Sequence, residues 1–100
     1  MIINKNISGS EMIAAPEDRI DTVTAPELEA ALQDMPADIE KLIIDFEKVT
    51  YISSAGLRVL LRAEKLMKDS GKSMVLRHVG EAIEEIFELT GFSDILTIEK

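Results

Sequence analysis

The sequence predicts a small α/β domain in which helices pack on a mixed β-sheet. Apolar runs typical of buried strands occur at residues 42–44 and 74–76. Between them, apolar residues recur near helical spacing over residues 57–67. A strand, a helix and a second buried strand form a crossover with parallel pairing. We therefore expect one domain over residues 1–100, with about four to five strands and about three to four helices.

The other elements are predicted from capping and turn residues. Apolar runs predict further strands over residues 2–7, 12–15 and 95–98. The charged residues 17–21 predict a connector. Thr24 and Glu27 have the spacing of a capping box, so a first helix is expected to begin at Thr24 and to end near Pro36. A third helix is expected to follow Gly80.

The composition excludes several classes of function. A net charge of −8 argues against binding to nucleic acid or to an anionic membrane, because both require a basic surface. The chain has no cysteine, and no apolar run approaches the roughly 18 residues of a membrane span, so we expect a cytoplasmic protein. We also expect a monomer. Its single histidine, His78, is expected to be an ordinary residue at a strand end. Without a Cys/His cluster of metal-ligand spacing, we expect neither a metal nor a cofactor.

The most informative residues are the consecutive serines Ser53 and Ser54, which come where the central helix is expected to begin. Serine is a favoured N-cap residue, and a cap would explain one hydroxyl. A helix N-terminus also favours anions. A phosphoserine there would add about 1.5 to 2 negative charges and would leave the helix intact. Capping and a phosphorylation switch both remain open.

Other polar groups have simpler interpretations. The central helix carries a basic stripe, which is a solvated face or a docking surface: Arg58, Arg62, Lys65 and Lys68. The third helix carries a row of carboxylates expected to face solvent: Glu81, Glu84, Glu85 and Glu88. An enzyme using Ser54 as nucleophile lacks a convincing base, because His78 lies on another predicted strand and no acid orients it. We therefore expect no catalytic residues.

Residues 42–61 closely resemble the signature of the STAS domain family, and more narrowly the stand-alone bacterial anti-sigma factor antagonists. Residues 19–28 resemble the family's segment leading into its first helix, and residues 72–76 and 87–92 resemble its closing half. The resemblance implies a STAS fold and a role in regulating transcription by partner switching. In such proteins the antagonist binds an anti-sigma factor that is also a serine kinase of the histidine-kinase-like ATPase fold. Phosphorylation releases the antagonist, and a serine phosphatase resets it.

Carried over to this chain, the resemblance implies that Ser54 is the phosphoacceptor, with Ser53 as second choice. The partner-binding residues that we expect are Asp21, Thr22, Ser53, Gly56, Leu57 and Arg58. Three positions depart from the family's pattern: Ser53 stands where Asp is frequent, Ala55 where a second hydroxyl is frequent, and Asp18 in place of a glycine. The alternative is a non-phosphorylated STAS scaffold subunit of a transporter or a stress-sensing assembly.

Overall fold

The computed structural model describes residues 1–99, which form three α-helices and two β-sheets. The strands are β1 (Ile3–Ser8), β2 (Glu11–Pro16), β3 (Asp18–Ile20), β4 (Lys41–Asp45), β5 (Val49–Ile52) and β6 (Ser73–Arg77). The helices are α1 (Ala25–Gln33), α2 (Ser54–Asp69), α3 (Glu81–Thr90) and a 3₁₀ turn, η1 (Phe92–Asp94). The predicted fold class, a mixed sheet with helices packed on it, is confirmed.

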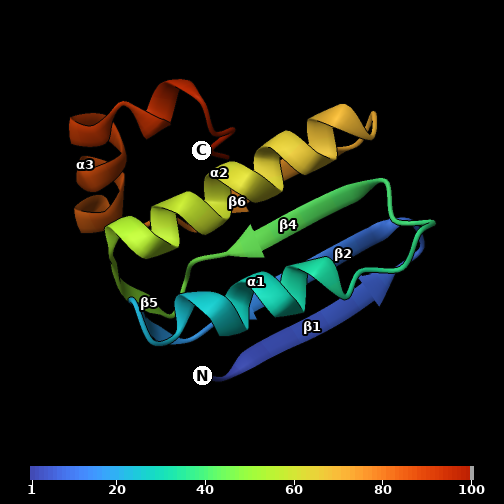
Figure 1. Ribbon diagram of the computed structural model, residues 1–100, viewed down its shortest axis with the longest axis horizontal. Coiled ribbons are helices and arrows are strands. Elements are labelled where there is room, and N and C mark those ends of the chain that lie inside the picture. The colour runs from blue at the N-terminus through green and yellow to red at the C-terminus, as the bar shows by residue number, and fades with distance from the viewer. Residues whose placement is uncertain (100) are drawn as a thin grey trace.

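The main sheet has the strand order β1-β2-β4-β6. β1 and β2 form an antiparallel pair, whereas β2 with β4 and β4 with β6 are parallel, as expected for strands joined through helices. Figure 1 shows α1 and α2 lying across the same face of this sheet. Alternate strand residues on that face are buried in the core: Met12, Ala14, Leu42, Ile44, Met74 and Leu76. β4 lies between β2 and β6, and its three central residues are buried, which matches the apolar run at residues 42–44.

A second, two-stranded sheet pairs β3 with β5 in parallel. These two strands were not predicted: residues 17–21 were expected to be a connector, and no strand was expected between residue 44 and the central helix. Both strands are short and mostly polar on their outer face, so they lack a hydrophobic run. The sheet matters because β5 leads directly into α2, and therefore fixes where the serine pair lies (Figure 1).

Helix α2 is amphipathic, with Leu57, Leu60 and Met67 buried and Arg58 and Arg62 exposed. Its apolar stripe faces the main sheet, which is the usual arrangement for a helix at a protein surface. Among the helices in residues 1–99, none has the length and apolar character needed to cross a membrane.

The start of α2 lies unusually close to the small sheet. Gly56 is buried, and a Cβ atom at this position would lie 2.7 Å from Ile20 Cγ2 and 2.7 Å from Ile52 Cγ1. The backbone N–H of Ser53 donates to the carbonyl of Ile20 at 2.8 Å. Glycine therefore allows the first turn of α2 to pack directly on side chains from β3 and β5.

Two local predictions were wrong. Thr24 does not cap α1 through its side chain; it has helical backbone angles, and its hydroxyl bonds to the preceding loop. Residues 95–98 do not form an edge strand; Ile98 makes only an isolated parallel bridge with Leu76. Thr24 bonds to the loop before it instead of capping the helix. The segment at residues 95–98 meets β6 only at Leu76 instead of pairing along it.

Replacing Gly56 by alanine is expected to destabilise the fold. Alanine gains about 1 kcal/mol of helix propensity over glycine, but packing the extra methyl group against two side chains at 2.7 Å costs roughly 1–3 kcal/mol. The net loss should be roughly 1 kcal/mol in the free energy of unfolding, measured by urea denaturation. Gly80→Ala is the control for space, because nothing lies within 4 Å of the added atom; its expected loss is only the preference for glycine over alanine at the N-cap of α3. Equal midpoints for Gly56→Ala and wild type would show that the contact is soft.

Candidate functional site

The two serines at the start of α2 have different environments. Ser53 is the N-cap residue, with extended backbone angles, and its Oγ accepts a hydrogen bond from the Gly56 N–H at 3.4 Å. Ser54 is the first residue of the helix and is exposed. Within residues 1–99, no hydrogen bond occupies the Ser54 hydroxyl. One hydroxyl therefore serves the helix, and the other faces solvent.

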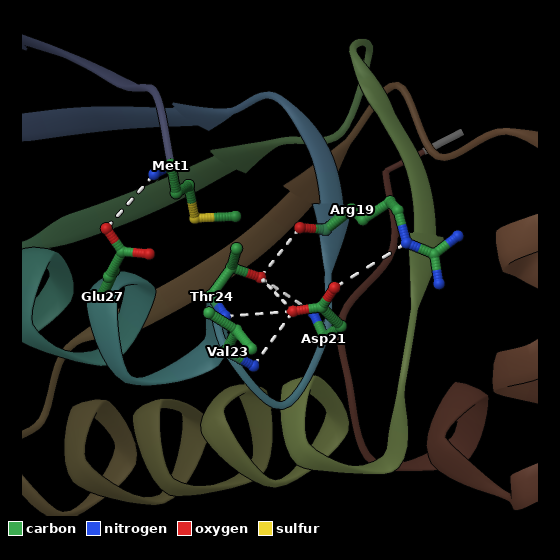
Figure 2. Close-up of polar contacts among 6 residues, drawn as sticks. All are labelled: Met1, Arg19, Asp21, Val23, Thr24 and Glu27. Carbon is green, nitrogen blue, oxygen red and sulfur yellow. Dashed lines mark hydrogen bonds and ion pairs between the residues drawn. The ribbon is translucent and has the colours of Figure 1, made fainter.

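Asp21 organises the loop between β3 and α1 (Figure 2). Its Oδ1 accepts hydrogen bonds from the backbone N–H groups of Val23 at 3.0 Å and Thr24 at 3.1 Å. Its Oδ2 lies 3.7 Å from Arg19 Nε. These contacts, led by the Thr24 N–H, hold the pKa of Asp21 below its ordinary value, although partial desolvation opposes them. The carboxylate is therefore ionised and already engaged within its own loop.

The Thr24 hydroxyl completes this loop. It accepts a hydrogen bond from the Asp21 N–H at 2.8 Å. Its single proton is donated to the carbonyl of Arg19 at 2.8 Å, which lies nearer than Asp21 Oδ1 (Figure 2). Glu27, the other half of the predicted capping box, instead pairs with the amino group of Met1 at 3.2 Å. The Asp-x-x-Thr spacing is the sequence signal for this turn, and it overlaps with the capping-box pattern of Thr24 and Glu27.

Thr22 and Arg58 lie beside one shallow cleft of about 120 Å³ between the starts of α1 and α2. Both residues are exposed. The fold thus brings together two of the predicted partner-binding residues from segments far apart in the sequence. The cleft is lined further by Ala25, Pro26, Glu29, Ala55, Val59 and Arg62.

Two of the predicted partner-binding residues have little exposed surface. Gly56 is buried against Ile20 and Ile52, and Leu57 is only 6% exposed. Both residues pack the start of α2 onto the protein and so set the position of the helix. The spacing of Leu57 with Leu60 was the signal for burial, since leucines three residues apart share a helix face.

Three exposed residues near the site were missed by sequence reasoning. Arg19 on β3 stacks over the ring of Tyr51 on β5, with its Cζ 4.4 Å from the ring centroid. Val23, at the tip of the loop that Asp21 organises, is 79% exposed. An isolated exposed valine needs no explanation by itself, but beside Thr22 it extends the candidate surface.

Two arginines, Arg58 and Arg62, lie on the exposed side of α2 after Ser54. Arg62 forms an ion pair with Glu29 of α1, which raises the pKa of Arg62 through their hydrogen bond. Arg58, one helical turn after Ser54, has no ion-pair partner among residues 1–99. Positions four residues apart on a helix are neighbours, so an unpaired cation lies next to the exposed hydroxyl.

The sequence profile of the STAS domain matches residues 3–100. The chain belongs to the STAS domain family. Among curated relatives of this STAS domain, the Bordetella bronchiseptica protein BtrV, provisionally named an anti-sigma factor antagonist, is 32% identical over 87% of this chain and 76% of that protein. The anti-sigma-B factor antagonist of Staphylococcus aureus is 29% identical over 81% of this chain and 76% of that protein.

Solved structures share the fold of this STAS domain. A Thermotoga maritima protein, provisionally described as an anti-sigma factor antagonist, superposes with a TM-score of 0.89 at 21% identity, covering 98% of this chain and 86% of that one. The phosphorylated form of the Bacillus cell fate determinant SpoIIAA gives 0.75 at 11% identity, covering 99% and 92%. A Wolinella succinogenes sulfate transporter family protein gives 0.79 at 17% identity, covering 92% and 75%.

Removing the charge of Asp21 should produce a pH-dependent loss of stability. A carboxyl whose pKa is lowered in the folded state stabilises the fold above its ordinary value of 3.8, and this contribution disappears as the pH falls through the folded-state pKa. Asp21→Asn should therefore unfold at lower urea concentration than wild type at pH 7, and the gap should close below that pKa. Asp38→Asn, an exposed loop change, is the control. A gap of constant size down to the lowest pH would contradict the ionic role.

Proposed function

We propose that this chain is an anti-sigma factor antagonist, a cytoplasmic, monomeric binding protein and not an enzyme, whose partner is released by phosphorylation of Ser54. The observation that carries the proposal is the exposed Ser54 hydroxyl at the start of α2. The names of the relatives support an anti-sigma factor as the partner. In our proposal this anti-sigma factor also acts as the serine kinase. A serine phosphatase would restore the binding form.

The geometry favours Ser54 over Ser53 as the acceptor. A kinase must place the hydroxyl in line with the γ-phosphate of ATP, so the acceptor has to be accessible. Ser54 is exposed, whereas Ser53 is half-buried and bonds to the Gly56 N–H. Phosphorylation at Ser53 would disturb the cap, but at Ser54 it would add negative charge to the first turn, where the helix dipole favours it.

The charges around Ser54 indicate how a phosphate would release the partner. Arg58 carries an unpaired positive charge one turn away, while Asp21 is engaged within its own loop. The unmodified surface therefore suits a partner that presents carboxylates. A phosphate of about −1.5 to −2 would reverse the local charge. A desolvated, unpaired charge in an interface costs roughly 2–5 kcal/mol, which is sufficient for release.

Ser54→Asp should abolish binding to the anti-sigma factor while leaving the thermal midpoint unchanged or slightly raised. The new carboxylate lies in the first turn of α2 and interacts favourably with the helix dipole, by about 0.3–1 kcal/mol. Binding is measured by titration calorimetry and stability by circular dichroism. Ser54→Ala, which adds no charge, is the control and should still bind. Wild-type affinity in the aspartate variant would exclude the switch at this site.

Incubation with ATP and the candidate kinase should place one phosphate on Ser54, identified by mass spectrometry of the digested protein. Ser54→Ala should remain unmodified, whereas Ser53→Ala should be modified, with its stability reduced by about 1 kcal/mol or less through loss of the cap. If neither serine of the wild-type protein is modified, the non-phosphorylated STAS scaffold becomes the better assignment.

Charge reversal at Arg58 should weaken partner binding by at least roughly tenfold, which corresponds to about 1.4 kcal/mol, because the carboxylates of the partner would then face a carboxylate. Lys68→Glu, the same charge change at the opposite end of α2, is the matched control and should have a much smaller effect. Association rates are measured at two salt concentrations, because salt screens the long-range field of the protein more than a local contact between charges. Equal effects of the two variants would remove Arg58 from the interface.

A further inference from the structure

We propose that Asp45, Glu47 and His78 form a binding site for a divalent transition-metal ion, with Zn²⁺ as the best candidate. His78 Nδ1 lies 2.9 Å from Asp45 Oδ1 and 4.0 Å from Glu47 Oε2. One ligand atom from each of the three side chains lies within 4.8 Å of the others. The expectation of no metal site rested on spacing along the sequence, and here the ligands come from segments about thirty residues apart.

The topology of the main sheet brings these ligands together. β4 and β6 are parallel neighbours, and Asp45 pairs with Arg77 at their carboxyl ends. His78 follows immediately, and Glu47 lies in the short turn after β4. The carboxyl edge of a parallel sheet is where open α/β folds commonly bind ligands.

The local backbone holds the ligands in place. Asp45 Oδ1 accepts a hydrogen bond from the Glu47 N–H at 2.9 Å, which fixes both the turn and the carboxylate. His78 has a φ of +57°, in the left-handed region that non-glycine residues seldom adopt. This conformation ends β6 and is compatible with the imidazole reaching Asp45 on the neighbouring strand.

The donor set suits zinc better than magnesium or calcium. An imidazole nitrogen with carboxylate oxygens is a common set for Zn²⁺, whereas Mg²⁺ and Ca²⁺ prefer oxygen ligands alone. Ligand atoms around a tetrahedral zinc ion lie roughly 3.3 Å apart, given bonds of about 2.0–2.1 Å. The separations of 2.9 and 4.0 Å bracket this value, and the Glu47 side chain is 70% exposed and free to adjust. Water would complete the coordination shell.

The local charge also favours a cation. Two carboxylates share one imidazole, and no lysine or arginine among residues 1–99 forms an ion pair with either of them. Lys48, the adjacent residue, is directed to Glu17 instead, at 3.8 Å. Coordination through Nδ1 requires that nitrogen to be unprotonated, so the ring proton would reside on Nε2. An ion would then neutralise both carboxylates.

The test is a calorimetric titration of the full chain, free of any affinity tag, with Zn²⁺ at pH 7. We expect one Zn²⁺ per chain. Loss of an outer-shell partner already weakens metal binding by roughly 10- to 100-fold, so His78→Asn and Glu47→Gln should each weaken it at least that much. Asparagine is chosen at position 78 because it tolerates the left-handed conformation. Because His78 is the only histidine of the chain, its ring signals in the proton NMR spectrum provide a direct second readout, and should shift with Zn²⁺ but not with Mg²⁺.

Glu88→Gln is the matched control, because it removes one carboxylate from the acidic face of α3, another group of carboxylates that could attract cations. It should leave Zn²⁺ affinity unchanged. The proposal is overturned if wild type shows no binding, if the His78 ring signals do not move, or if Glu88→Gln weakens binding as much as Glu47→Gln. None of these outcomes bears on Ser54, so the result is independent of the proposed partner switch.

Discussion

The contact on which the candidate site depends is the close approach of Gly56 to Ile20 and Ile52. It joins the first turn of α2 to both strands of the small sheet. The hydrogen bond from the Ser53 N–H to the carbonyl of Ile20 holds the start of the helix to the same sheet. These two constraints determine how far α2 projects and which way its first residues face. The direction of the Ser54 side chain is therefore set by packing beneath it and not by contacts of its own.

Much of the fold could be predicted because its signals are local. The apolar run at residues 42–44 is typical of a buried central strand, and the leucines of α2 recur at the spacing of an amphipathic helix. β3 and β5 could not be predicted in the same way. They are three and four residues long and expose most of their side chains, so their existence depends on pairing with each other across thirty residues of chain.

The candidate site shows the same division. The start of α2 at the serine pair could be predicted, because serine is a favoured N-cap residue. Which of the two serines is the cap depends on backbone geometry, which the sequence alone does not give. Asp21 was expected to bind a partner, whereas its carboxylate accepts hydrogen bonds from the N–H groups of its own loop, as its spacing from Thr24 would have allowed us to predict. The contact between Asp45 and His78 was only partly predictable: the crossover predicts parallel pairing of β4 and β6, but not the register that places Asp45 beside Arg77.

The separation of tasks between the two adjacent serines has a consequence for turnover. Because the cap is provided by Ser53, a group added at Ser54 would change what the surface attracts without shortening the lifetime of the folded chain. Modified molecules would persist as long as unmodified ones against cellular proteases. If the proposed switch operates, a cell could keep the protein in its phosphorylated form and restore the binding form by hydrolysis of the phosphoester alone, with no new synthesis.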